Sequence, residues 1–193
     1  MDSLYGIPVN APTRNDLLDR CIAYHGHLCM GQALGVRLAL KGVELIGTGN
    51  PKEMIVFIEN DRCIADAVQI VTGTRIGRRC AKLINYGKMA ATFLNTETGV
   101  AYRINMRHLT PDVRHSEEAI RQILHVPEAE LLAWKRVRVP MKPEDFPGPP
   151  RRTVNCSRCG EKIFDGREVP SNGELWCLSC AHGSYYEIVE ENR

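Results

Sequence analysis

The chain has 193 residues, 44% of them hydrophobic and 25% charged, with a formal net charge of +2. These values are typical of a soluble globular protein with one domain of about 100–150 residues and a small module. The charge is too small to indicate nucleic-acid or membrane binding. The sequence lacks a signal peptide and an apolar stretch of bilayer length, so a cytoplasmic protein without membrane contact is expected. In that reducing compartment, eight cysteines indicate metal binding or redox chemistry rather than disulfides.

Two predicted helices flank a turn that carries three reactive side chains. The first helix is capped by Thr13 or Asn15 and ends near residue 24, and the second runs from about residue 30 to residue 42. The turn between them contains His25, His27 and Cys29. Imidazole and thiolate groups are metal ligands and can also act in acid–base or nucleophilic chemistry. We therefore predict a functional site here, with Cys29 at a helix N-terminus that favours its thiolate.

A second cysteine is predicted at the start of a third helix. Residues 53–59 form a run of β-branched and aromatic side chains typical of a buried strand. Asp61 is the predicted N-cap of the following helix, which places Cys63 in its first turn. Taken alone, Cys63 is better explained as a small buried hydrophobic residue.

The segments after this helix predict a basic loop, a hairpin and two more helices. Residues 73–79 form a Gly-punctuated basic loop, which is either a site for an anionic ligand or an ordinary solvated loop. Residues 89–94 and 100–106 predict two strands joined by a turn. Ser116 is the expected cap of one helix, and residues 127–134 are expected to open another.

The composition changes after residue 140. Five prolines fall within residues 140–150, which predicts a stiff linker over residues 141–152. The linker separates a domain over residues 1–140 from a second domain over residues 153–193.

The second domain carries four cysteines in two C-x2-C pairs, which are Cys156, Cys159, Cys177 and Cys180. This spacing is typical of a zinc site. Four thiolates complete a tetrahedral shell and leave no position for water, so the site is expected to be structural. A module of about forty residues buries too little apolar surface to fold without the metal.

Three motifs in the first domain resemble the FmdE family, which takes its name from formylmethanofuran dehydrogenase. They lie at residues 24–31 with 35–37, at residues 59–69 and at residues 86–91, and the resemblance covers residues 10–140. It implies an α+β fold with a thioredoxin-like mixed β-sheet core flanked by helices, and a treble-clef zinc finger over residues 153–193. It also implies a site where His25, His27, Cys29 and Cys63 converge, able to hold a second metal ion, and it makes a homodimer plausible.

The sequence departs from the family pattern at two positions. Met30 replaces the proline that usually follows the signature cysteine, a mild change at a helix start. Thr74 stands where the family tends to have a cysteine. A hydroxyl is a poorer ligand than a thiolate for a borderline metal, so we expect metal binding in the first domain to be weak if that cysteine is a ligand elsewhere.

Three functions are compatible with these features. The first is a metal- or thiol-dependent redox or accessory protein linked to molybdenum or tungsten enzymes of the formylmethanofuran dehydrogenase type, as an oxidoreductase or a protein associated with one. The second is a non-catalytic carrier of a metal or cofactor, which would bind anionic groups through Arg37, Arg75 or Lys88 and dock a partner through the zinc finger. A zinc-finger regulator that binds nucleic acid through the linker arginines ranks last, because the acidic C-terminal end of the cysteine module argues against DNA binding.

Overall fold

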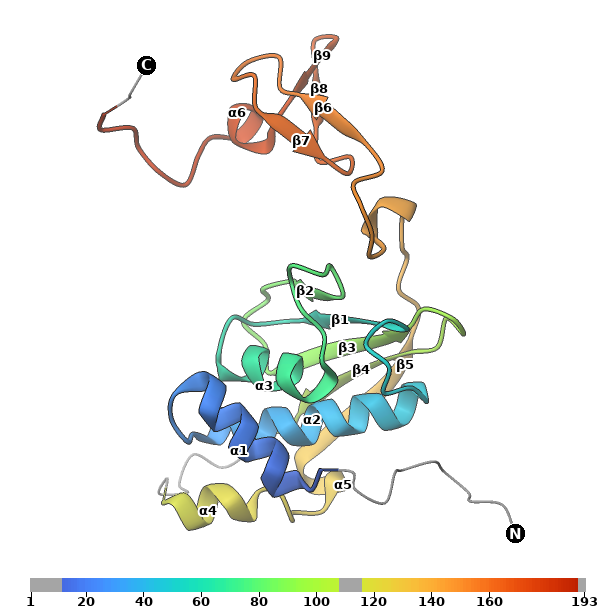
Figure 1. The fold of residues 1–193 in the computed structure, drawn as a ribbon, viewed down its shortest axis with the longest axis vertical. Coiled ribbons are helices and arrows are strands. Elements are labelled where there is room, and N and C mark those ends of the chain that lie inside the picture. The colour runs from blue at the N-terminus through green and yellow to red at the C-terminus, as the bar shows by residue number, and fades with distance from the viewer. Residues whose placement is uncertain (1–11, 108–115, 191–193) are drawn as a thin grey trace. The chain divides into compact units, whose positions relative to one another are not determined.

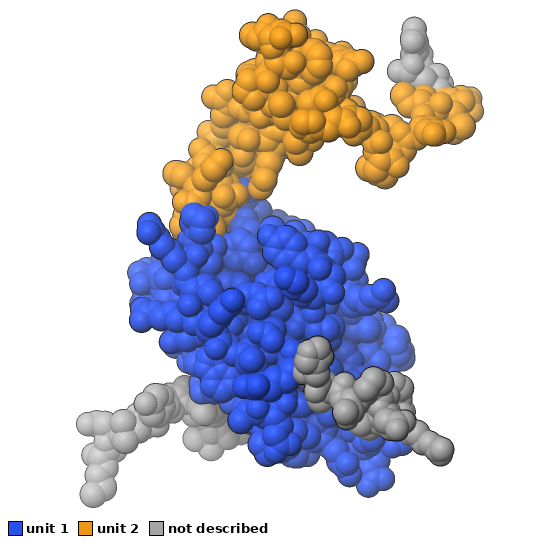
Figure 2. All heavy atoms as spheres, turned by 180° about the vertical axis from the view of Figure 1, so that it is seen from behind, with its two compact units in different colours: residues 1–140 blue, residues 141–193 orange. Residues whose placement is uncertain are grey.

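The computed structural model describes residues 12–107 and 116–190 of the chain. The chain divides into two compact units, Met1–Pro140 and Met141–Arg193, called unit 1 and unit 2 below and coloured separately in Figure 2. None of the helices in the described part of the chain combines the length and the apolar character that crossing a bilayer requires.

Unit 1 is built on a five-stranded mixed sheet with the strand order β2-β1-β3-β4-β5. Strands β1 and β2 are parallel, and the other neighbours are antiparallel. The strands are β1 (Met54–Ile58), β2 (Ala81–Leu83), β3 (Ala90–Asn95), β4 (Ala101–Met106) and β5 (Leu132–Val137). The predicted α+β architecture with a central mixed sheet is therefore confirmed.

Five helices belong to the described part of unit 1. They are α1 (Arg14–His25), α2 (Met30–Ile46), α3 (Cys63–Thr72), α4 (Glu117–Gln122) and α5 (Glu128–Leu131). Helix α2 packs against β3 and β4 and against α3, and α1 packs against α2 and α3 (Figure 1). The starts of α2 and α3 and the end of α1 thus belong to one packed group of helices.

The caps agree with the sequence at two helices and differ at a third. Thr13 and Asp16 form a capping box at α1, and Ser116 caps α4 by accepting a hydrogen bond from the backbone of Ala119. At α3 the N-cap is Arg62 and not the predicted Asp61, and the Arg62 side chain makes no capping hydrogen bond. Its first turn therefore has N–H groups without a side-chain acceptor from the cap.

Helix α2 continues through Gly42, where the sequence predicted its end. A Cβ atom at Gly42 would lie 2.5 Å from three ring carbons of Phe93, so the glycine is required for the contact between α2 and β3. The helix ends instead at Ile46, before Gly47 with a φ of 70°. Tertiary packing thus explains why Gly42 lies within the helix, whereas the local sequence pattern predicted that the helix ends there.

The predicted helix over residues 127–134 is shorter than expected. Helix α5 covers Glu128–Leu131, and from Leu132 the chain forms β5, in which Trp134 pairs with Ile104 of β4. Pairing along β4 outweighs the local helical pattern, because context commonly overrides intrinsic propensity in short segments.

Unit 2 contains small β-hairpins and a short helix. It comprises a 3-10 turn (Pro143–Asp145), β6 (Thr153–Asn155), β7 (Lys162–Phe164), β8 (Val169–Ser171), β9 (Glu174–Trp176) and α6 (Leu178–His182). The turn at Asn172–Gly173 joins β8 to β9, and both residues have the positive φ of such hairpin turns.

Candidate metal sites

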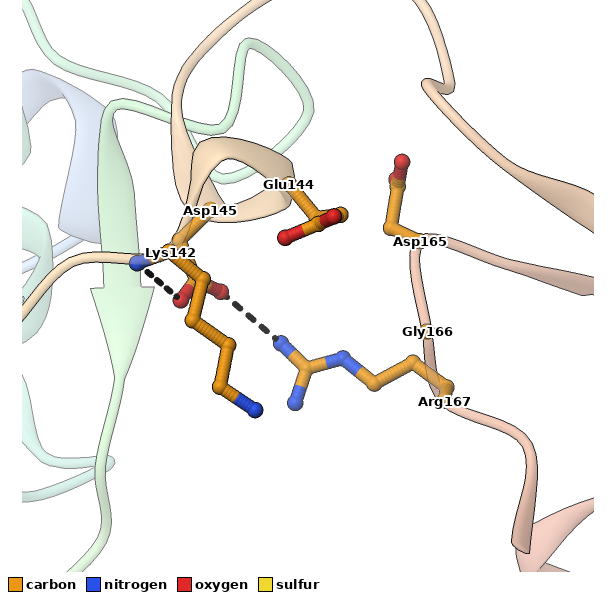
Figure 3. Close-up of a pocket in the computed structure, with 6 residues that line it drawn as sticks. All are labelled: Lys142, Glu144, Asp145, Asp165, Gly166 and Arg167. Atoms are coloured by element: carbon orange, nitrogen blue, oxygen red, sulfur yellow. Dashed lines mark hydrogen bonds and ion pairs between the residues drawn. The ribbon is translucent and has the colours of Figure 1, made fainter. Parts of the chain in front are cut away.

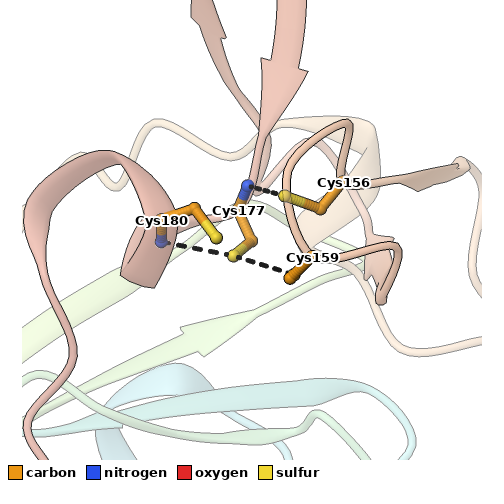
Figure 4. A group of neighbouring side chains, drawn as sticks. All are labelled: Cys156, Cys159, Cys177 and Cys180. Carbon is orange, nitrogen blue, oxygen red and sulfur yellow. Dashed lines mark hydrogen bonds between the residues drawn. The ribbon is translucent and has the colours of Figure 1, made fainter.

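The four cysteines of unit 2 converge on one point. Their sulfur atoms all lie within 4.8 Å of one another, and the Cys159 and Cys177 sulfurs are 3.9 Å apart (Figure 4). Metal–sulfur bonds of about 2.3 Å in a tetrahedral shell place sulfurs roughly 3.8 Å apart. The cluster therefore fits a metal ion such as zinc.

Local backbone structure prepares these sulfurs to act as ligands. Burial tends to raise the pKa of the Cys156 thiol, but backbone N–H groups, led by that of Cys159, lower it to about 6. The backbone N–H of Cys177 donates to the Cys156 sulfur at 3.2 Å, and that of Cys180 donates to the Cys177 sulfur at 3.4 Å. Such N–H···S bonds orient the thiolates and stabilise their negative charge.

The turn between α1 and α2 brings together the first three predicted site residues. One ligand atom from each of His25, His27 and Cys29 lies within 4.8 Å of the others, and the two imidazole rings have centroids 4.7 Å apart. Gly26, with a φ of 94°, ends α1 and reverses the chain between the two histidines. Cys29 is the N-cap of α2. Two ring nitrogens and a sulfur are a donor set that suits zinc and similar ions.

Asp66 orients the imidazole of His25. Its Oδ2 atom lies 2.8 Å from His25 Nδ1, and both side chains are partly buried. The other ring nitrogen, Nε2 of His25, is buried without a hydrogen-bond partner in the described structure. A carboxylate on one nitrogen with the other nitrogen open is the arrangement that metal-binding histidines commonly have. The sequence analysis missed Asp66, although its position three residues after Cys63 places it on the same face of α3.

Cys63 faces Cys29 across Gly31. A Cβ atom on Gly31 would lie 2.9 Å from Cys63 Cβ, 3.5 Å from Cys63 Sγ and 3.9 Å from Cys29 Sγ. Only glycine therefore lets the first turns of α2 and α3 approach this closely. Cys63 thus lies beside the three-residue cluster, and its thiol contributes to a raised pKa of Cys29.

The pKa of Cys29 is raised, whereas the sequence led us to expect that the helix start lowers it. Burial raises the pKa of Cys29, and the Cys63 thiol raises it further. The backbone N–H groups of Gln32 and Gly31 act in the opposite direction without compensating for this. A bound cation would supply the missing positive charge, because thiolates bind metals in deprotonated form.

Comparison with known proteins decides the family. The family described as "FmdE, Molybdenum formylmethanofuran dehydrogenase operon" matches residues 24–133, which is more than half of the chain. The chain belongs to the FmdE family. Its match includes the cluster of His25, His27 and Cys29 together with Cys63 and Asp66.

Two individual proteins resemble this FmdE chain. A tungsten formylmethanofuran dehydrogenase FmdE-like protein from Syntrophus aciditrophicus has the same fold, with a TM-score of 0.64 and 20% identity over 95% of this chain and 100% of that one. A probable S-adenosyl-L-methionine-binding protein of Archaeoglobus fulgidus is 26% identical over 205 residues. That alignment covers 90% of this chain and 54% of the relative, so the chain spans about half of its length.

Arg37 has a structural position in this FmdE domain, which speaks against the predicted cofactor-binding role. The residue is buried, and its Nη1 atom donates to the carbonyl oxygens of Ile123 and Val126 at 2.9 and 2.7 Å. These bonds fix the end of α4 against α2. Burial lowers the pKa of Arg37.

We expect Arg37→Met to destabilise unit 1 by about 2–4 kcal/mol, because two buried carbonyl oxygens lose a charged donor. Urea unfolding of the full chain would measure this change. Arg78→Met, which removes an exposed arginine, is the control and should change stability by less than about 0.5 kcal/mol. Equal stabilities of the Arg37 variant and the control would contradict the structural role.

Arg75 and Lys88 lie apart from the histidine turn in the chain and differ in how they are held. Arg75 Nη1 donates to the carbonyl oxygens of Gln69 and Thr74, both at 2.8 Å. The Lys88 ammonium lies 5.7 Å from the ring centroid of Tyr86, and its carbonyl accepts a hydrogen bond from Asn60. Anion binding by these two residues stays a prediction.

Thr74 lies at the opposite end of α3 from Cys63. The helix between them has ten residues, which corresponds to a length of about 15 Å. Thr74 is buried, and its hydroxyl is 2.8 Å from that of Thr72. Thr74 thus lies about one helix length from Cys63, and its effect on metal binding stays a prediction.

Unit 2 also contains a shallow polar pocket between the 3-10 turn and the loop after β7 (Figure 3). Asp145 accepts from the backbone N–H of Lys142 at 3.4 Å and pairs with Arg167 at 3.5 Å. Because these groups hold the turn against the loop, we assign the pocket a structural role.

Proposed function

We propose that this FmdE protein is a metal-binding accessory protein of molybdenum or tungsten enzymes of the formylmethanofuran dehydrogenase type. Unit 1 would hold a metal ion through His25 Nε2, His27 and Cys29, and unit 2 would hold a structural zinc ion through its four cysteines. The observation that carries the unit 1 site is the buried, unpartnered Nε2 atom of His25, whose other nitrogen is held by Asp66.

The two sites differ in what they can do chemically. Four thiolates close the shell of a metal in unit 2, which is typical of a structural site. Three protein ligands in unit 1 leave one position for an exogenous ligand, and a metal there would act as a Lewis acid. In unit 1, the bond between Asp66 and His25 fixes the orientation of one ligand. The close approach of α2 to α3 at Gly31 places Cys63 beside the three ligands.

Two finer structural features belong to the same proposal. The paired cysteines near β6–β7 and at the start of α6 support a treble-clef zinc finger. The order β2-β1-β3-β4, with β1 and β2 parallel and the other pairs antiparallel, supports a thioredoxin-like core. The proposal also includes a homodimer. It further assigns to the cysteine module the docking of enzyme partners, which the exposed side chains of Phe164 and Leu178 in unit 2 support.

Metal analysis of the full chain, purified without oxygen, tests the proposal. We expect about two metal ions per chain in the wild type and about one in Cys29→Ser, because a hydroxyl replaces the only thiolate among the three unit 1 ligands. Asp66→Asn should keep the ion but weaken its binding roughly 10–100-fold, because the carboxylate orients His25.

The controls are Cys80→Ser and His125→Ala, which alter a buried thiol and an exposed imidazole outside the cluster and should leave two ions bound. One ion per chain in the wild type, with none lost in Cys29→Ser, would contradict the unit 1 metal site.

The position of Cys29 and Cys63 on either side of Gly31 favours a second candidate, a redox-active thiol pair. Oxidation would join the two sulfurs and release two protons and two electrons to an acceptor. The metal analysis separates the two functions with Cys63→Ser. This variant should retain both ions if unit 1 holds its metal through His25, His27 and Cys29. A wild-type chain with one ion and an oxidisable Cys29–Cys63 pair would instead favour the redox function.

A further inference from the structure

Gln32 presents an unpaired acceptor beside the unit 1 site. The residue is wholly buried in the first turn of α2, and its Nε2 atom donates to the carbonyl oxygen of Cys63 at 3.0 Å. Its Oε1 atom is buried and has no hydrogen-bond partner in the described structure. Buried side-chain oxygens in native proteins are nearly always paired, so this one requires an explanation.

The hydrogen bond to Cys63 identifies which atom of the Gln32 amide is unpaired in the described structure. A carbonyl oxygen can only accept, so the group that faces Cys63 must be the amide nitrogen, and the oxygen is the unpaired end. Gln32 follows Cys29 by three residues, which places both side chains on the same side of the first turn of α2. The amide of Gln32 is therefore held between the starts of α2 and α3, because its nitrogen is bonded to the first residue of α3. Gly31, which precedes Gln32, lies beside the sulfurs of Cys63 and Cys29.

The neighbouring thiols do not provide a lasting partner for this oxygen. A thiol is a weak donor, and neither the Cys29 nor the Cys63 thiol is hydrogen-bonded to this oxygen in the described structure. A metal ion is itself no hydrogen-bond donor. The donor that remains is a group brought into the site, such as the O–H of water or an alcohol or the N–H of an amine.

We propose that the exogenous ligand of the unit 1 metal is a hydrogen-bond donor, and that Gln32 Oε1 accepts its hydrogen bond. This inference rests on the metal site proposed above. Gln32 thereby becomes a ligand-selecting residue. Binding of water, alcohols and amines is favoured, because each can donate a hydrogen bond to Gln32 Oε1. An anion without a hydrogen, such as azide, binds more weakly, because it displaces the donor and faces the lone pairs of a buried oxygen.

Azide binding to the cobalt-loaded full chain tests the inference. Zinc is left in the four-cysteine site, and cobalt(II) is placed in unit 1, where its visible spectrum reports ligand exchange. We expect Gln32→Met to bind azide roughly three- to tenfold more tightly than the wild type, because the acceptor that retains the donor ligand is gone. Gln32→Glu keeps an acceptor and loses the donor to Cys63, so its azide affinity should not rise. Gln69→Met is the matched control, since the Gln69 amide donates only within α3, and it should behave as the wild type does.

The possible results separate the two proposals. A cobalt spectrum that is absent, or that survives in Cys29→Ser, overturns the metal site and the inference with it. A normal cobalt spectrum with equal azide affinity in the wild type and Gln32→Met overturns the inference alone. An equal rise in Gln32→Met and Gln32→Glu also overturns it, because the bond to Cys63 would then be responsible. If Gln32→Met fails to fold, Gln32→Glu is measured alone. A rise in its azide affinity then overturns the inference, and an unchanged affinity supports it.

Discussion

Replacement of Cys177 by serine is expected to unfold unit 2 while unit 1 keeps its structure. In the described part of unit 2, the buried hydrophobic residues are only Cys156 and Ile163, so the unit has almost no apolar core. Small modules of this kind gain their stability from the metal, with apparent binding free energies of about 10–16 kcal/mol for structural zinc. A serine hydroxyl is a much poorer ligand and opens the four-thiolate shell.

Backbone amide spectra of the isotope-labelled full chain would measure this effect residue by residue. We expect signals of residues 153–182 to collapse into the range of unfolded chains, one metal ion per chain to be lost, and signals of residues 14–106 to stay in place. Cys80→Ser, which changes a buried thiol of unit 1, should leave the signals of unit 2 unchanged. A folded unit 2 in the Cys177 variant would show that its hairpins are stable without four thiolates.

Truncation of Phe93 to alanine is expected to cost unit 1 about 3–5 kcal/mol of stability, typical of deleting a buried aromatic ring. Phe93 is wholly buried in β3 and is the largest side chain among the fully buried residues. Its ring packs onto α2 at Gly42, where an added Cβ would lie at 2.5 Å, so no side chain of α2 is present there to fill the cavity. Helix α2, which begins after Cys29 and carries Gln32, would lose the packing of this ring.

Urea unfolding of the full chain, followed by circular dichroism, is the measurement. Tyr86→Ala is the matched control, because its ring is 65% exposed and its loss should change stability by less than about 0.5 kcal/mol. A cost below about 1 kcal/mol for Phe93→Ala would mean that α2 and β3 close over the missing ring.

The sequence identified the reactive groups of both candidate metal sites because their signals are local. Two C-x2-C pairs and a five-residue turn with His25, His27 and Cys29 can be read without knowledge of the fold, since the spacing alone brings the ligands of each pair or turn together. The strand and helix around Cys63 were also predicted, because buried strands and capped helices have strong periodic patterns.

Other features depended on contacts between segments far apart in the chain. Asp66 lies 41 residues from His25, and only the packing of α1 against α3 places its carboxylate on the ring nitrogen. The role of Gly42 inside α2 depends on its contact with the ring of Phe93 in β3. The formation of β5 in place of the predicted helix depends on its pairing with β4.

The sequence by itself thus determined the chemistry that is available: two imidazoles and a thiol on one turn, a second thiol at a helix start, and four thiolates in a module too small to fold without metal. Only the tertiary structure decided how that chemistry is arranged. It buried Arg37 as a donor to two carbonyls and placed Thr74 a helix length away from Cys63. Among the residues that the structure describes, it left Nε2 of His25 and Oε1 of Gln32 without hydrogen-bond partners. The physical reason is that burial and hydrogen-bond pairing depend on which helices and strands pack together, whereas ligand type and local spacing are written in the chain.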